Sequence, residues 1–286
     1  MIYLNGKFLP IEQAYIPVLD RGFIFGDGIY EVIPVYSRKP FRLSEHLIRL
    51  QHSLDGIRLD NPHSEAHWSQ LIAHIIAHNE GEDQYLYLHI TRGVAKRDHA
   101  FPLGVPPTVF IMSTPLPPPP QALLASGVPA ITAQDNRWGR CDIKAISLLP
   151  NVLLRQLAID ARTMETILLR DGLLTEGAAS NIFIVKDEVL LAPPKDHRML
   201  PGITYDVVLE LAETHAIPHA VREISEAELR SAQEIMLTSS TKEILAITRL
   251  DGEPVGNAKP GPVFQQLNQH YQAYKATMMR GQPALS

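Results

Sequence analysis

The sequence predicts an α+β fold of two domains, and three observations support this prediction. The chain has 286 residues, which is enough for two domains of ordinary size. Strand-like and helix-like segments mix without the strict strand–helix–strand alternation of a doubly wound fold. The segment Pro115-Leu-Pro-Pro-Pro-Pro120 can enter neither a central strand nor a helix interior. We therefore expect a smaller N-terminal domain (1–114), an extended linker (115–121) and a larger, β-rich C-terminal domain (122–286), with largely antiparallel sheets.

Local patterns predict the elements of the N-terminal domain. Asn5-Gly6 is a hairpin turn signal between two short apolar segments. Ser44 can cap a helix that ends near Ile57, because leucines fall on one face of this segment at helical spacing. A second helix is expected over 65–78. Bulky and β-branched residues predict strands at 85–91 and 108–113.

The C-terminal domain is expected to continue with the same mixture of elements. Strands are predicted at 128–134 and 140–144, followed by a helix from Val152 to about Thr163. Asp171-Gly172 and Asp251-Gly252 mark further hairpin turns. A helix should follow Pro201-Gly202 and run from Thr204 to about Thr214.

Composition and charge limit the classes of function. The formal net charge is -5 and no basic stripe is present, so a nucleic-acid partner is not expected. No apolar run approaches the length of a membrane span, and the N-terminus lacks the pattern of a signal peptide. Cys141 is the single cysteine, which fits a reducing compartment and predicts a cytoplasmic location.

Lys144 becomes notable through the segments that accompany it. It ends the run Arg137-Trp-Gly-Arg-Cys-Asp-Ile-Lys144, and taken alone it would be read as a solvated surface lysine. The other segments are Arg21-Gly-Phe-Ile-Phe-Gly-Asp-Gly-Ile-Tyr-Glu31, Arg97-Asp-His99, Thr175-Glu-Gly-Ala-Ala-Ser-Asn181 and Pro201-Gly-Ile-Thr204. Each of these also has an ordinary explanation as a polar loop, a strand end or a turn.

In this order the segments resemble the class IV aminotransferases, pyridoxal-phosphate enzymes of fold type IV. Within that family the resemblance is strongest to the D-amino acid aminotransferases, and it extends from Tyr3 to about Gly252. It implies transamination between a D-amino acid, such as D-alanine or D-glutamate, and 2-oxoglutarate or pyruvate. The implied mechanism is ping-pong, through an imine (Schiff base) on Lys144. The resemblance also implies a homodimer with shared active sites.

The resemblance assigns the cofactor-binding residues. Lys144 corresponds to the imine-forming lysine, whose amine can also carry a proton. Glu176 corresponds to the carboxylate that pairs with the ring nitrogen and keeps the cofactor an electron sink. A helix start and nearby hydroxyl groups suit the phosphate. The residues matched to the phosphate are Arg49, Ile203, Thr204, Ser239 and Ser240.

Tyr30, Arg97 and His99 correspond to the residues that bind the substrate α-carboxylate in D-amino acid aminotransferases. Arg97 and His99 would reach across the dimer interface, where a guanidinium can bind a carboxylate through two hydrogen bonds. Two features depart from the family pattern. Ala178-Ala179 replaces serines, although the backbone N–H groups could still donate. Lys242 stands where a small polar residue is usual, and it could either favour acidic side chains or point into solvent.

Three other functions are compatible with parts of the sequence. A branched-chain L-amino acid aminotransferase would share the cofactor residues, but Arg97 and His99 argue against it. An aminodeoxychorismate lyase would also share them and would release pyruvate. A cofactor-binding protein without catalysis is the non-enzymatic alternative, and the presence of Lys144, Glu176 and Arg49 argues against it.

Overall fold

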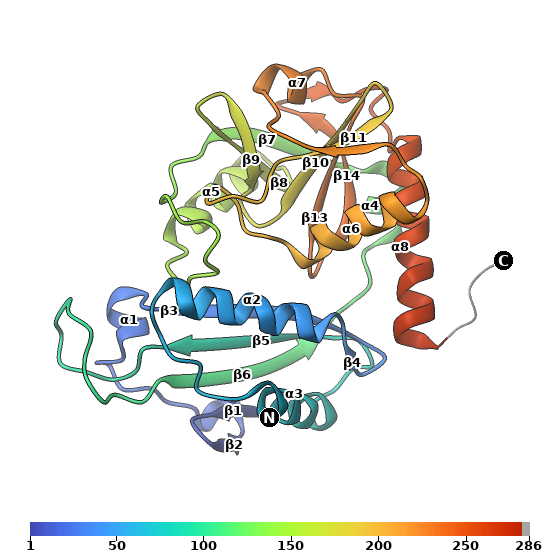
Figure 1. The fold of residues 1–286 in the computed structure, drawn as a ribbon. Coiled ribbons are helices and arrows are strands. Elements are labelled where there is room, and N and C mark those ends of the chain that lie inside the picture. Colours follow the sequence, from blue (N-terminus) through green and yellow to red (C-terminus); the bar gives the residue numbers. More distant parts are fainter. Residues whose placement is uncertain (282–286) are drawn as a thin grey trace. The chain divides into compact units, whose positions relative to one another are not determined.

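A computed structural model describes residues 1–281, which form two compact units (Figure 1). The first unit comprises residues 1–117 together with 143–148. The second comprises 118–142 and the chain from Leu149 onward. The proline-rich segment lies where the chain first passes from one unit to the other. Residues 143–148 nevertheless pack with the first unit, and Lys144 therefore belongs to it structurally.

The first unit is built on a six-stranded sheet in which all neighbouring strands are antiparallel (Figure 1). The Asn5-Gly6 turn joins the first two strands, with both residues at positive φ. In spatial order the strands are β2 (Lys7–Leu9), β1 (Ile2–Leu4), β6 (Thr108–Pro115), β5 (Gln84–Thr91), β3 (Gly28–Tyr36) and β4 (Lys39–Pro40).

Two long helices of the first unit cover the same face of this sheet. The helices are η1 (Ile11–Gln13), α1 (Arg21–Phe25), α2 (Leu43–Gly56) and α3 (Glu65–His78). Leu54 of α2 and Trp68 of α3 share one hydrophobic core with Ile29 and Ile33 of β3. Successive strand residues point to opposite faces, so Tyr30 points away from this core while Glu31 points towards α2.

The second unit contains a nine-stranded mixed sheet. Three neighbouring pairs are parallel, namely β11/β12, β7/β14 and β7/β8, and the others are antiparallel. In spatial order the strands are β12 (His219–Val221), β11 (Val189–Ala192), β10 (Asn181–Lys186), β13 (Glu234–Ser239), β14 (Glu243–Leu250), β7 (Val128–Gln134), β8 (Glu165–Arg170) and β9 (Leu173–Gly177), while β15 (Glu253–Pro254) pairs with β14.

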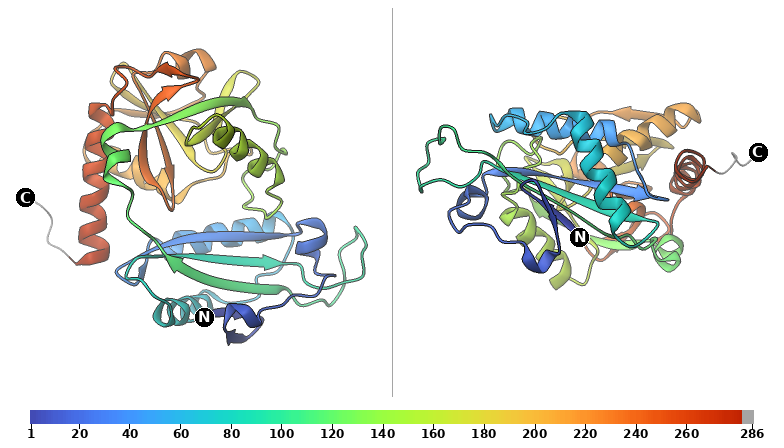
Figure 2. Two further views of the ribbon diagram at one scale, coloured as in Figure 1. Left: turned by 180° about the vertical axis from the view of Figure 1, so that it is seen from behind. Right: turned by 90° about the horizontal axis from the view of Figure 1, so that it is seen from below.

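Helices cover the sheet of the second unit. They are α4 (Gln121–Ser126), α5 (Leu149–Asp160), α6 (Ile203–Thr214), α7 (Glu226–Arg230) and α8 (Pro262–Arg280). The red helix α8 packs against α6 and against strands β13 and β14 (Figures 1 and 2). The strands form the core largely from isoleucine, leucine and valine.

The structure confirms the α+β architecture and most of the predicted elements. The helix over 65–78 has the predicted bounds, and both Asp-Gly turns join antiparallel strands. The antiparallel prediction holds in the first unit, whereas the sheet of the second is mixed. No helix within residues 1–281 has the length and hydropathy of a membrane span.

Two local predictions were wrong. Ser44 does not cap α2, because the helix begins at Leu43 after Arg42, which adopts a left-handed conformation and makes no side-chain cap. No strand forms over 140–144. Backbone groups there bond instead to a loop and to a strand edge: Cys141 N–H donates to His197 O at 2.8 Å, and Lys144 O accepts from Tyr30 N–H at 3.0 Å.

The core beneath α2 provides a stability prediction. Leu54 is fully buried, and Ile48 on the same helix is 67% exposed. Leu54→Ala should lower the free energy of unfolding by about 2–5 kcal/mol, because it removes buried surface and leaves a cavity. Ile48→Ala is the matched control and should change it by less than about 0.5 kcal/mol. Urea denaturation measures both, and equal effects would contradict the described packing.

Candidate active site

Lys144 lies against the edge of β3 in the first unit. Tyr30 N–H donates to Lys144 O at 3.0 Å, and Ile146 N–H donates to Gly28 O at 3.1 Å. This antiparallel pairing places Lys144 opposite Tyr30 on one face, while Ile143 enters the core on the other. The Lys144 ammonium lies 4.2 Å from the centre of the Tyr30 ring. Two of the predicted site residues are therefore direct neighbours.

Arg49 is held by a buried carboxylate, Glu31, that the sequence analysis had not singled out. Its Nε and Nη2 donate to the two carboxylate oxygens at 2.8 Å each, and Nδ1 of His46 lies 2.9 Å from Oε2. Burial alone would raise the pKa of Glu31, but Arg49 and then His46 outweigh it and hold this pKa far below its ordinary value. Glu31 is thus ionised and fixes the guanidinium in place. In the sequence, the only feature that could have drawn attention to Glu31 is its position next to Tyr30.

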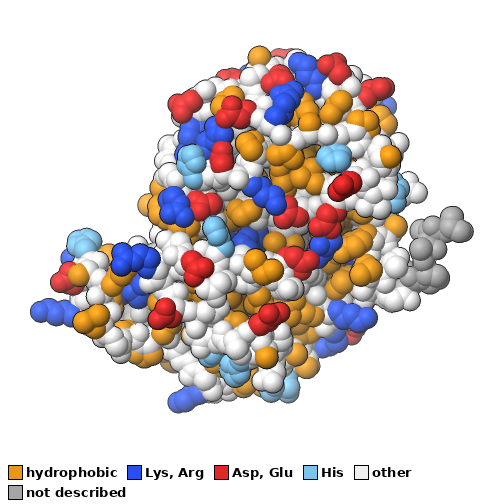
Figure 3. Space-filling model, in the orientation of Figure 1, with side chains coloured by type: hydrophobic (Ala, Val, Ile, Leu, Met, Phe, Trp, Pro, Cys, Tyr) orange, Lys and Arg blue, Asp and Glu red, His pale blue; other side chains and the backbone are white. Residues whose placement is uncertain are grey.

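Arg97 and His99 lie on an exposed loop of the first unit whose backbone is tied down. The buried Arg21 donates from Nη1 to the carbonyl oxygens of Asp98, at 2.6 Å, and Ala100, at 3.3 Å. The Arg97 guanidinium and the His99 ring both lie near the Phe25 ring, at 5.4 and 5.3 Å. Basic, histidine and hydrophobic side chains gather on this protruding loop (Figure 3). The anchored backbone presents both predicted residues to the outside.

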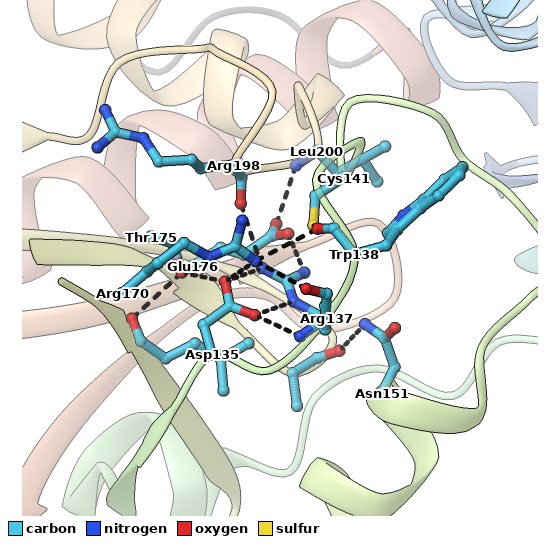
Figure 4. A network of polar contacts seen from close by, with 12 residues as sticks. Asp135, Arg137, Trp138, Cys141, Asn151, Arg170, Thr175, Glu176, Arg198 and Leu200 are labelled. Atoms are coloured by element: carbon cyan, nitrogen blue, oxygen red, sulfur yellow. Dashed lines mark hydrogen bonds and ion pairs between the residues drawn. The ribbon is translucent and has the colours of Figure 1, made fainter.

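Glu176 is buried in the second unit and both of its oxygens have donors (Figure 4). Arg137 Nη1 donates to Oε1. The Leu200 N–H donates to Oε2 at 3.2 Å, with Asn181 Nδ2 3.4 Å from the same atom. Burial raises the pKa of Glu176 to about 7, although Arg137 opposes the increase. The carboxyl group can therefore change its charge near neutral pH.

A second carboxylate, Asp135, holds Arg137 in place. It accepts from Arg137 Nε and Nη2 at 2.9 Å each, from the Thr175 hydroxyl at 3.0 Å, and pairs with Arg170 at 3.0 Å. The two carboxylates and two guanidinium groups form one connected cluster (Figure 4). In the sequence, Arg137 stands out only as the start of the segment that ends at Lys144. Nothing in the local sequence indicated that Arg137 binds Glu176, 39 positions away.

The start of α6 in the second unit suits an anion. Gly202 precedes the helix, and a side chain there would collide with Asn181 Oδ1. Ile203 and Thr204, both buried, form the first turn, whose free N–H groups and dipole favour negative charge.

Strand β13 ends in the hydroxyl residues that were predicted for the same anion. Ser239 and Ser240 are half-buried, and the Ser239 hydroxyl already accepts from Lys242 N–H at 3.1 Å. The preceding Thr238, which pairs with Asn181 across the sheet, has a buried hydroxyl without a hydrogen-bond partner among the described residues. Thr238 is therefore a candidate ligand that the sequence analysis missed.

Ala178 and Lys242, which depart from the family pattern, both make contacts with neighbouring residues. The Ala178 N–H donates to Thr166 O at 2.9 Å, so this backbone donor, expected to be available, is already used. Lys242 does not point freely into solvent: its Nζ lies 3.4 Å from Oε2 of Glu165, a buried carboxylate that also accepts from the Ser180 hydroxyl at 2.8 Å. Within residues 1–281 no group of three or more side chains is arranged to hold a metal ion.

Comparison with known proteins identifies the family. The amino-transferase class IV family model matches residues 28–250. The D-alanine aminotransferase of Bacillus licheniformis is 38% identical over 266 residues, which cover 93% of this chain and 94% of that protein. The enzyme of the same name from Staphylococcus aureus is 37% identical and covers 96% of this chain and 97% of its own length. The chain belongs to the class IV aminotransferases.

Solved structures of branched-chain aminotransferases share the fold. The Escherichia coli enzyme superimposes with a TM-score of 0.87 at 27% identity, covering 99% of this chain and 95% of that one. A branched-chain aminotransferase from Thermoproteus uzoniensis, solved with norvaline, gives a TM-score of 0.85 at 26% identity, covering 100% and 98%. The predicted fold type IV architecture is thereby confirmed.

The pKa of Glu176 predicts how stability depends on pH. Glu176 ionises near 4.5 in the unfolded chain and near 7 in the folded one, so between these values the unfolded state binds fewer protons. The cofactor-free protein should therefore lose up to about 3 kcal/mol as the pH rises from 4.5 to 7, at about 1.36 kcal/mol per pKa unit. Glu176→Gln should lack this loss.

Thermal unfolding at pH 5 and pH 8 tests this. The difference in Tm between the two pH values should be smaller for Glu176→Gln than for the wild type. Glu253→Gln, at an exposed position, serves as the control and should follow the wild type. The same pH dependence in all three proteins would show that Glu176 ionises normally.

Proposed function

We propose that this chain catalyses pyridoxal-phosphate-dependent transamination between a D-amino acid and a 2-oxo acid. The observation that carries the proposal is the position of Lys144, whose ammonium lies over the ring of Tyr30 and beside the strand that bears Glu31. The extended similarity to D-alanine aminotransferases, at 37–38% identity over more than nine-tenths of the chain, supports the D-specific form.

The residues of each unit fit the parts of the cofactor. Lys144 supplies an amine that can anchor the aldehyde and then carry a proton to and from the substrate α-carbon. In the first unit Arg49 is a group that suits a phosphate. In the second unit the suitable groups are Thr204, the hydroxyls of Ser239 and Ser240, and the N–H groups at the start of α6. Pyridoxal phosphate, when bound, supplies the electron sink that makes the α-proton removable.

Glu176 is the residue that would bind the ring nitrogen. Its carboxylate accepts from Arg137, Asn181 and Leu200, and a carboxylate has acceptor capacity for one further donor. A protonated ring nitrogen would favour the ionised form of Glu176, which burial otherwise opposes. Arg137, fixed by Asp135, keeps the side chain oriented while the charge changes.

Substrate recognition requires a carboxylate site, for which we propose Tyr30, Arg97 and His99. Both basic residues are exposed on a loop with an anchored backbone, so they can serve a neighbouring copy of the chain. Large apolar side chains of the same unit are also exposed, among them Leu103 at 97%. Exposed apolar surface of this kind is typical of an interface. These features support the proposal that the chain forms a homodimer with shared active sites.

A branched-chain L-amino acid aminotransferase is the second candidate, favoured by the structural similarity to such enzymes. A substrate panel separates the functions. With 2-oxoglutarate as acceptor, D-alanine and D-glutamate should give a higher kcat/KM than their L-enantiomers and L-leucine. Pyruvate release from aminodeoxychorismate should be absent. A preference for L-leucine would replace the proposal with the second candidate.

Substitution of Lys144 tests the chemical assignment. Lys144→Ala should lower kcat by several orders of magnitude, because it removes both the covalent anchor and the proton carrier. Reduction with borohydride should attach the cofactor to the wild type and not to the variant, as mass spectrometry can show. Lys259→Ala, at an exposed position, is the control and should be labelled and active like the wild type. Normal turnover of Lys144→Ala would eliminate the assignment.

A complementation experiment tests the shared site. Lys144→Ala and Arg97→Ala chains should each be weakly active, whereas a mixed dimer should contain one site with both defects and one with neither. Activity should therefore reappear after subunits exchange, and mass spectrometry can verify the exchange. Proven exchange without recovery would mean that Arg97 serves its own subunit.

A further inference from the structure

The ring of His46 has one buried nitrogen, Nε2, that takes no part in the contact with Glu31. The side chain is fully buried, and Nδ1 lies 2.9 Å from Glu31 Oε2. Since Glu31 is ionised, Nδ1 must carry the hydrogen of this bond, and Nε2 of the neutral ring is left as an acceptor. Nε2 has no hydrogen-bond partner among the described residues. A buried polar atom without a partner is costly and points to a ligand.

The charges around His46 come from three elements. Glu31 on β3 favours the protonated ring, while Arg49 on α2 and Lys144 in segment 143–148 disfavour it. Burial is the largest effect and, together with the two cations, lowers the pKa of His46. An anion of charge −2 beside Arg49 would reverse the sign of the local potential and favour protonation of Nε2.

The geometry makes His46 a suitable anion ligand. His46 and Arg49 are three residues apart on α2, so they lie on the same face of the helix, and both are fastened to one carboxylate. Glu31 thereby sets the orientation of the imidazole and the guanidinium at once. A phosphate ester near neutral pH carries close to two negative charges and three strong acceptor oxygens.

We propose that Nε2 of His46 is a proton-linked ligand of the phosphate: the ring takes up one proton as a phosphate dianion binds beside Arg49, and then donates a hydrogen bond to it. The proton comes from the solvent or the buffer, and the ring changes from neutral to cationic. This inference rests on the proposed function, because that function places the cofactor phosphate at Arg49.

The protonation state of His46 can be observed directly. The probe is pyridoxine 5′-phosphate, which carries the phosphate but no aldehyde, and therefore forms no bond with Lys144. In cofactor-free protein labelled with ¹⁵N-histidine, the Nε2 signal of His46 should move from the range of an unprotonated to that of a protonated nitrogen at saturation. The signal that is missing from His46→Asn identifies it. An unchanged signal at saturation would overturn the proposal.

His46→Asn isolates the contribution of Nε2 to binding. The asparagine amide can still donate to Glu31, but it has no atom in place of Nε2. The variant should bind pyridoxine 5′-phosphate about tenfold to hundredfold more weakly, as expected for a hydrogen bond to a charged group. It should bind pyridoxine, which lacks the phosphate, as the wild type does. His78→Asn, at an exposed position of α3, is the matched control and should bind both probes normally.

Calorimetry distinguishes a failure of the proposal for His46 from a failure of the proposed function. Titrations in two buffers of different ionisation enthalpy should show uptake of a proton by the wild type that is absent in His46→Asn. Equal uptake and affinity in the two proteins would overturn the role of His46 and leave the proposed function standing. A wild type that fails to bind pyridoxine 5′-phosphate at all would overturn both.

Discussion

Two backbone hydrogen bonds, between the edge of β3 and residues 144 and 146, determine where Lys144 lies. They attach a short segment from beyond the linker to the first unit, at the strand that also carries Tyr30 and Glu31. Because successive residues in extended backbone point to opposite faces, neighbouring residues here lie on different sides of the sheet. Ile143 is buried in the core, and Lys144 shares a face with Tyr30. The candidate chemistry therefore depends on a pairing between chain positions more than a hundred residues apart.

Each unit buries a carboxylate against a guanidinium, and the two pairs behave differently. Glu31 receives two hydrogen bonds from Arg49 and one from His46, and its pKa falls far below the ordinary value. Glu176 receives one from Arg137, a residue that Asp135 also holds, and its pKa rises to about 7. The first carboxylate is a fixed negative charge that orients cations. The second can change its charge when a charged group binds next to it, and its proposed pairing with the cofactor ring nitrogen would use this property.

Local sequence patterns were enough to predict elements whose apolar residues recur at a regular spacing. The helix over 65–78 was predicted within its observed bounds, because its apolar positions recur at helical spacing. The strand expected at 140–144 failed, since these residues bond to a distant strand edge and to His197 instead of forming a strand. Family resemblance pointed to Lys144 and Glu176. It did not point to Arg137 or His46, whose importance arises only from contacts with residues distant in sequence.

In the loop that bears Arg97 and His99, backbone atoms hold the conformation while these two side chains are exposed. Arg21 binds the loop through the carbonyl oxygens of Asp98 and Ala100, atoms that every amino acid possesses. The side chains at positions 97 and 99 remain outside this attachment. Substitutions at positions 97 and 99 therefore leave the groups that accept hydrogen bonds from Arg21 unchanged. Under the role proposed for these two side chains, a change in substrate preference would need no change in the hydrogen bonds that fix the loop backbone.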